Sequence, residues 1–191
     1  YGEVPIMRSG GRAEVRQVNG RWVVTGPFAQ RLRIVDGRLE EFGEPDALYL
    51  NDGSGRFRPV PWNSEYFLDE DGKPSPELWD FALAVQMRDL NDDGAPDIYV
   101  CNDFQTPDRI WLNDGTGRFR ALPRLAMRKH SYSSMGVDFA DLDHDSFLDF
   151  FVVEMLSREH VLRMRQVVSM TVTVPVPGQI EQRPQVTRNT L

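Results

Sequence analysis

Residues 89–97 read DLNDDGAPD, and residues 141–149, which lie 52 positions further on, read DLDHDSFLD. In both stretches an oxygen-bearing side chain stands at positions 1, 3, 5 and 9. Each stretch is followed by a short apolar run and preceded by a segment with the alternation of a strand, at 82–87 and at 135–139. The pattern predicts a unit of strand, acidic loop and strand that occurs twice.

A second repeat extends this unit. Residues 45–58 read PDALYLNDGSGRFR and residues 107–120 read PDRIWLNDGTGRFR, so ten of the fourteen positions are identical. Each copy has the form of a short strand, a glycine-containing turn and a second strand, and glycine supplies the positive φ that such turns need. Strand, acidic loop, strand, turn, strand, glycine turn and strand is the plan of a four-stranded propeller blade.

The acidic loops concentrate the negative charge of the chain. Acidic residues outnumber basic ones 29 to 22, and eight of the 18 aspartates lie in the two loops. Gathered carboxylates repel one another, and a hard divalent cation reverses the sign of that interaction. Calcium accepts about six to eight oxygens in flexible geometry, whereas magnesium demands a strict octahedron. We therefore expect about two Ca²⁺ sites, with side-chain ligands at positions 1, 3, 5 and 9 and a carbonyl ligand at position 7: Asp89, Asn91, Asp93, Ala95 and Asp97, then Asp141, Asp143, Asp145, Phe147 and Asp149.

The residues present exclude an EF-hand and separate the two acidic loops from an ordinary turn. An EF-hand requires a glutamate at position 12, where this chain has Val100 or Val152. Residues 69–72 (DEDG) lack the later acid and predict an ordinary turn. At position 6, where a left-handed backbone is expected, the second loop carries Ser146 in place of glycine, at a cost of about 1 kcal/mol. His144 is expected to point outward.

The two ends of the chain differ from the repeats. Residues 13–25 and 31–42 predict hairpins closed by Asn-Gly at 19–20 and Asp-Gly at 36–37. Residues 157–170 have helical spacing, with Ser157 as the N-cap and solvated arginines, and 188–191 resemble the start of another hairpin. We divide the chain into N-terminal β-hairpins at 1–44 (a degenerate blade or an appended element), propeller blades at 45–153, and a helical insertion with the start of a further blade at 154–191.

Residues 89–100 and 108–119, followed by the stretch at 134–145, resemble the FG-GAP/VCBS repeat of integrin-α-type β-propellers. Within that group the chain is similar to bacterial exported proteins related to cartilage acidic protein. The resemblance covers about residues 45–153 and implies a calcium-loaded propeller, with the eight side chains given above as ligands. It implies no particular catalytic activity. The fold class we expect is all-β: a partial β-propeller of about three four-stranded antiparallel blades with calcium loops. A short helical insertion near 157–170 follows them.

Composition narrows the function classes. A net charge of −7 and a pI near 5.0 argue against nucleic acid and anionic membranes as main partners. No apolar run approaches the ~18 residues of a spanning helix, so we expect no direct membrane insertion. The single cysteine, Cys101, excludes an intrachain disulfide and is expected to be a small buried thiol. The histidines are scattered, no nucleophile motif is visible, and the serines at 131–134 are expected in a loop, so we predict no catalytic residues. Trp111 is expected to pack inside a blade.

These observations favour a calcium-binding, non-catalytic repeat module that binds a protein or glycan ligand outside the cytosol. The alternative is the scaffold portion of a carbohydrate-active hydrolase or lyase whose catalytic residues lie outside this segment. A cytosolic adaptor is disfavoured because the calcium concentration of the cytosol is too low to saturate weak sites. Extracellular calcium modules bind calcium with dissociation constants near ~10⁻⁴–10⁻³ M. We expect an extracellular, cell-surface or periplasmic location. A signal peptide is not visible in this segment, and the blades are expected to belong to a larger propeller.

Overall fold

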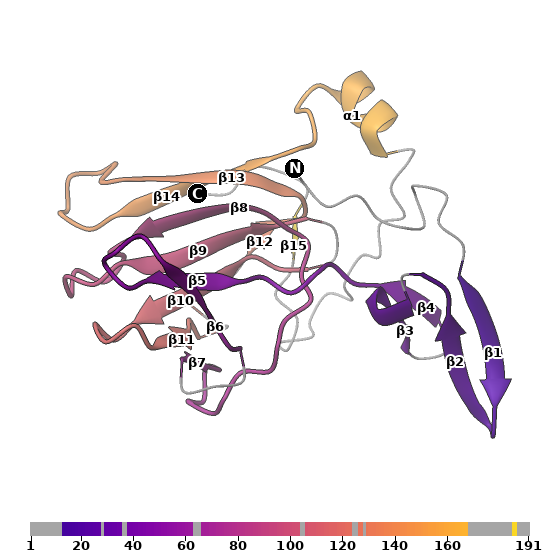
Figure 1. The fold of residues 1–191 in the computed structure, drawn as a ribbon. Coiled ribbons are helices and arrows are strands. Elements are labelled where there is room, and N and C mark those ends of the chain that lie inside the picture. Colours follow the sequence, from indigo (N-terminus) through magenta and orange to yellow (C-terminus); the bar gives the residue numbers. More distant parts are fainter. Residues whose placement is uncertain are drawn as a thin grey trace.

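The computed structural model describes residues 13–27, 29–35, 38–62, 66–103, 106–123, 126–127, 129–167 and 185–186. These residues are mostly β-strands, and their one α-helix is short, which agrees with the expected all-β class. No helix among the described residues is long and apolar enough to cross a membrane. Figure 1 shows the strands as stacked layers, with two small hairpins set to one side.

The central layer is a five-stranded sheet in the order β7-β11-β10-β9-β8. It consists of β7 (Phe67–Leu68), β8 (Ala82–Arg88), β9 (Asp97–Asn102), β10 (Arg109–Asn113) and β11 (Phe119–Ala121). Strands β8 to β11 are antiparallel neighbours in chain order, as a blade requires. Strand β7 adds to β11 in parallel, a pairing that the sequence pattern did not predict.

A two-stranded ribbon packs on each face of this sheet. One is β5 (Leu48–Asn51) with β6 (Phe57–Val60), and the other is β13 (Ser134–Ala140) with β14 (Asp149–Glu154). All six residues of β9 are buried because both of its faces are covered. The described residues therefore hold one complete four-stranded unit between two half units, where the sequence predicted about three four-stranded blades.

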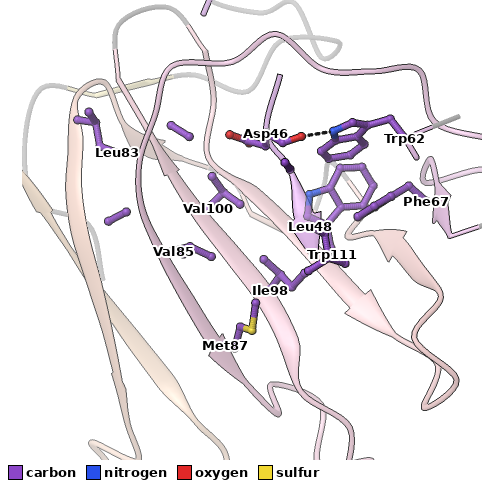
Figure 2. Close-up of a pocket in the computed structure, with 13 residues that line it drawn as sticks. Asp46, Leu48, Trp62, Phe67, Leu83, Val85, Met87, Ile98, Val100 and Trp111 are labelled. Carbon is purple, nitrogen blue, oxygen red and sulfur yellow. Dashed lines mark hydrogen bonds between the residues drawn. The ribbon is translucent and has the colours of Figure 1, made fainter. Parts of the chain in front are cut away.

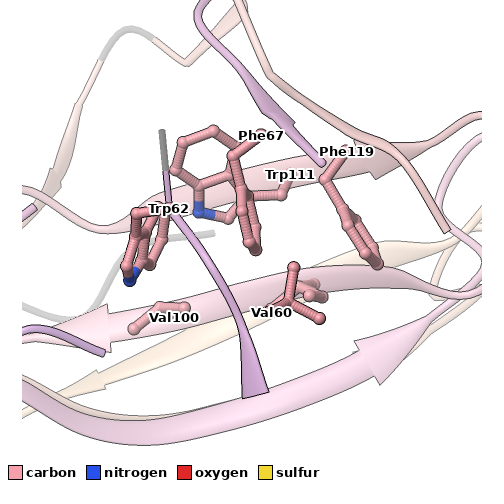
Figure 3. Close-up of a cluster of buried hydrophobic side chains, with 7 residues drawn as sticks. Val60, Trp62, Phe67, Val100, Trp111 and Phe119 are labelled. Atoms are coloured by element: carbon pink, nitrogen blue, oxygen red, sulfur yellow. The ribbon is translucent and has the colours of Figure 1, made fainter. Parts of the chain in front are cut away.

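The core divides into two clusters, one on each face of the central sheet. The first lies under the β5–β6 ribbon and is rich in aromatic rings (Figure 3). Phe67 stacks on Trp62 with ring centroids 4.2 Å apart and meets Trp111 edge-on at 5.3 Å. The second cluster lies under β13–β14 and includes Tyr99, Cys101, Val137, Phe139 and Val152. The predictions that Trp111 packs inside a blade and that Cys101 is buried are both confirmed.

The N-terminal part forms the two predicted hairpins, which lie beside the layers (Figure 1). The first pairs β1 (Glu14–Val18) with β2 (Arg21–Thr25), and its turn has positive φ at Asn19 and Gly20. The second pairs β3 (Leu32–Val35) with β4 (Arg38–Glu41) after the 3₁₀ turn η1 (Ala29–Arg31); its turn at 36–37 lies outside the described residues.

The C-terminal part contains α1 (His160–Val167), which lies within the predicted range 157–170 but is shorter. Its N-cap is Glu159 and not Ser157. The Glu159 carboxylate accepts the N–H groups of Val161 (3.1 Å) and Leu162 (2.8 Å), and the Glu159 carbonyl accepts Arg163 N–H. The Ser157 hydroxyl instead accepts Glu159 N–H. A short parallel pair joins β12 (His130–Ser131) to β15 (Gln185–Val186), and the hairpin predicted at 188–191 lies outside the described residues.

Candidate functional site

Both acidic stretches form loops between paired strands, as predicted, and both loops lie at the same end of the layers (Figure 1). Residues 89–97 connect β8 to β9, and residues 141–149 connect β13 to β14. The backbone is left-handed at positions 4 and 6 of each loop: Asp92 (φ 59°) and Gly94 (φ 86°), then His144 (φ 63°) and Ser146 (φ 75°). The expectation of a left-handed residue at position 6 is confirmed even where glycine is missing.

The two loops share a set of five hydrogen bonds. In each, the aspartate at position 1 accepts the N–H groups of positions 5 and 6. Position 3 also accepts from position 5, position 5 accepts from position 7, and position 9 accepts from position 2. Every acceptor is a side-chain oxygen, so backbone N–H groups of the same loop hold these oxygens in place. The conformation follows from the spacing of the oxygens and does not depend on the intervening residues.

Three carboxylates of the second loop converge. One oxygen each from Asp141, Asp143 and Asp149 lies within 4.8 Å of the others, a spacing at which a single cation can contact all three. Among the described residues, none of the ion pairs involves an aspartate of either loop. No basic side chain among the described residues therefore forms an ion pair with this group.

The first loop differs at position 3, where an amide replaces a carboxylate. Asn91 Nδ2 donates to Asp93 Oδ2 at 2.8 Å, and Asn91 Oδ1 accepts Asp93 N–H at 3.3 Å. The loop keeps three carboxylates at positions 1, 5 and 9, together with an amide oxygen, a donor set of the kind that calcium accepts. At position 7, Ala95 is buried while Phe147 is exposed, and carbonyl ligation by either residue stays a prediction.

Asp97 connects the first loop to the rest of the blade. Its carboxylate is fully buried; Oδ2 accepts Leu90 N–H (2.8 Å) and Oδ1 accepts the N–H of Asn113 on β10 (2.7 Å). Burial raises the pKa of Asp97, and the like charges of Asp93 and Asp89 raise it further. Divalent charge at this position would offset both causes.

The turn at 69–72 behaves as predicted from the sequence. Asp69 Oδ1 accepts the N–H groups of Asp71 (3.0 Å) and Lys73 (2.8 Å), and Gly72 has a positive φ. The side chain thus closes an ordinary turn on its own backbone.

Comparison with known families identifies the segment that carries both loops. Residues 89–152 match the FG-GAP-like repeat. The match covers 64 of the 191 residues and runs from position 1 of the first loop to Val152 on β14. No curated protein and no solved structure matches the chain. The FG-GAP-like repeat supports a propeller-type repeat module.

A buried polar cluster lies where β10 and β13 begin and β14 ends, and the sequence did not reveal it. Asp108 Oδ2 accepts the hydroxyls of Tyr99 (2.9 Å) and Ser134 (2.8 Å), and Asp108 Oδ1 accepts Asn102 N–H (2.9 Å). Nearby, Glu154 Oε2 accepts the N–H groups of Tyr132 and Ser133. The serines at 131–134, expected in a loop before a strand, lie at and between the ends of β12 and β13, and all three are fully buried.

Proposed function

We propose that this protein is a calcium-binding β-propeller repeat module that acts outside the cytosol and binds a protein or glycan ligand without catalysis. The convergence of Asp141, Asp143 and Asp149, with no ion pair to a described basic side chain, is the observation that carries the calcium assignment. The first loop supports it, because its side-chain oxygens are held by the same five hydrogen bonds. Each ion would be structural, joining a loop to the strands on either side of it.

Calcium titration of the 191-residue chain tests the assignment. We expect about two sites with dissociation constants near ~10⁻⁴–10⁻³ M, weaker binding of magnesium, and a higher melting temperature with calcium. At ten times the dissociation constant, each site would add about 1.4 kcal/mol to the free energy of unfolding. Isothermal titration calorimetry and thermal unfolding measure both quantities.

Matched variants locate the sites. Asp141→Asn together with Asp143→Asn is expected to remove one of the two sites and leave the other. Asp71→Asn, in the ordinary turn at 69–72, is expected to leave both. A chain that takes up no calcium and shows no shift in melting temperature would contradict the calcium assignment.

The β1–β2 hairpin supports a role in ligand binding. Trp22 is 58 % exposed, whereas Trp62 and Trp111 are buried, and Val15, Val18 and Val23 of the same hairpin are exposed as well. An exposed indole can stack on a sugar ring or anchor a protein contact.

A glycan array and a Trp22→Ala variant test this role. Binding is expected to weaken about tenfold or more in the variant because the stacking surface is lost. Calcium affinity should be unchanged, since the hairpin lies away from both loops. Equal binding by the variant and the natural chain would remove the hairpin from the proposed site.

A further inference from the structure

The central sheet carries apolar side chains that stay exposed among the residues that the structure describes. Val85 and Met87 on the edge strand β8 are 56 % and 52 % exposed. They line an apolar pocket of about 300 Å³ between β8 and the β5–β6 ribbon, together with Ile98, Val100 and Trp111 (Figure 2). We call this surface the β8 face.

The repeat shows what belongs on the β8 face. Shifting Val85 and Met87 by 52 positions gives Val137 and Phe139 on β13, which are only 7 % and 8 % exposed. These residues are buried against Tyr99, Cys101 and the other residues of the second core cluster. A blade of this protein thus covers such a face with the Tyr99 and Cys101 side of its neighbour.

The described part of the chain carries a second copy of that covering surface, and this copy is exposed. Shifting Tyr99 and Cys101 by the same 52 positions gives Phe151 and Val153 on β14, and both are exposed. We call them the β14 face. In one molecule the β14 face and the β8 face cannot meet, because β13–β14 packs on the opposite side of the central sheet from the pocket.

The backbone edges agree with the side chains. In the complete blade, β9 pairs with β10, with Tyr99 opposite Ile110 and Ile98 opposite Trp111. Among the described strands, β14 pairs only with β13 and β5 pairs only with β6, so each ribbon has a free edge. The 62-residue repeat makes Leu48 on β5 the equivalent of Ile110. A β14 strand placed beside β5 in the same register would set Phe151 opposite Leu48.

Polar groups at this edge match as well. In the complete blade, Asn113 N–H donates to Asp97 Oδ1 across the β9–β10 pair. The equivalents are Asn51 at the end of β5 and Asp149 at the start of β14. Asp149 Oδ2 accepts Leu142 N–H, which matches the bond from Leu90 to Asp97 and places Asp149 for the same second bond.

We propose that copies of this chain associate head to tail, with the β14 face of one copy on the β8 face of the next and β14 paired with β5. The occupant of the pocket is thus the β13–β14 ribbon of a second copy, and each contact completes a four-stranded blade from two chains. This proposal goes beyond the proposed function, which it does not require.

The contact is heterologous, so repetition of it closes a ring or continues as a filament. The described strands of each copy would contribute one complete blade and two half blades. A ring of about two to four copies would therefore contain the four to eight blades of closed propellers. The proposal also accounts for Tyr49, which is exposed on the outer side of β5 although its equivalent, Trp111, is buried. In the ring, Tyr49 would face the complete blade of the neighbouring copy.

Sedimentation velocity of the 191-residue chain over a range of concentrations tests the proposal. We expect the mass of two or more copies, and a monomer at every concentration would overturn it. Val85→Asp damages only the β8 face and Val153→Asp only the β14 face, and each variant alone is expected to be monomeric. Both positions are exposed, so the variants should keep the circular dichroism spectrum of the natural chain.

Mixing the two variants separates this proposal from other modes of association. The Val85→Asp chain keeps an intact β14 face and the Val153→Asp chain keeps an intact β8 face. An equal mixture is therefore expected to form a heterodimer and to stop there. A mixture that stays monomeric, or single variants that keep the natural mass, would overturn the assignment of the two faces. Val161→Asp, at an exposed position of α1 outside both faces, is the control and should keep the natural mass.

A disulfide cross-link tests the register. The natural Cys101 is buried, so introduced thiols have no competing partner on the surface. The Leu48→Cys, Phe151→Cys double variant is expected to form covalent oligomers on oxidation, whereas each single variant should not. An assembled double variant that forms no cross-link would overturn the pairing of β14 with β5.

Discussion

Asp97→Asn is expected to lower the free energy of unfolding by about 3 kcal/mol and to weaken calcium binding at the first loop tenfold or more. The carboxylate is fully buried and accepts N–H groups from both Leu90 and Asn113. A hydrogen bond to a charged group contributes about 1.5–3 kcal/mol, and an amide can accept only one of the two donors. The other N–H would face an NH₂ group in a buried site. Chemical denaturation with calcium and with a chelator measures the two effects separately.

Asp149→Asn is the matched variant for this prediction. Asp149 occupies the same position of the second loop but is only partly buried, and the hydrogen bond from Leu142 is its described backbone contact. At concentrations too low for copies of the chain to associate, we expect Asp149→Asn to lower the free energy of unfolding by about 1 kcal/mol. The variant should also lose one calcium site. Equal losses of stability for the two variants would show that the bond from Asn113 to Asp97 contributes nothing.

The loops and hairpins could be predicted because their determinants are local. Asn19 and Gly20 adopt the positive φ that an Asn-Gly turn predicts, and Gly94 does so at position 6 of the first loop. The oxygens at positions 1, 3, 5 and 9 bond N–H groups two to seven residues away, so the spacing alone specifies the loop conformation. Even Ser146 adopts the left-handed conformation, because the rest of the loop imposes it.

The pairing and stacking of distant segments could not be predicted in the same way. Strand β7 is two residues long and pairs with β11, which lies 52 residues further on, through Phe67 and Phe119. No local pattern marks such a partner. The same is true of Trp62, whose indole donates to the carbonyl of Asp46 and stacks on Phe67. These contacts depend on how the layers stack, which a repeat implies only in outline.

The buried polar cluster was missed for a related reason. Asp108 precedes β10, Ser134 begins β13 and Glu154 ends β14, so the fold brings together groups that are 20 or more residues apart. In sequence, Ser131–Ser134 have the composition of a loop, whereas in the fold they are fully buried apart from Tyr132, which is nearly so. Burial raises the pKa of Asp108 to about 6, and the carboxylate of Glu154 adds to the increase. Burial also raises the pKa of Glu154 itself and that of the neighbouring Cys101 thiol, the latter to about 12.

The contribution of Asp108 to the stability of the fold is therefore expected to fall as the pH rises from about 4 to about 6.5. Asp108 keeps its proton up to about pH 6 in the folded chain but loses it near 3.8 in the unfolded chain. Between these values the folded state binds more protons, so its free energy of unfolding decreases with increasing pH and then levels off. A difference of about two pKa units corresponds to about 3 kcal/mol. Asp108→Asn removes the titrating group. When the free energy of unfolding is measured by urea denaturation in saturating calcium, the variant should therefore lose about 3 kcal/mol less than the natural chain over this pH range. Parallel slopes for the two chains would contradict the prediction, because all other carboxylates, including those of the calcium loops, are common to both.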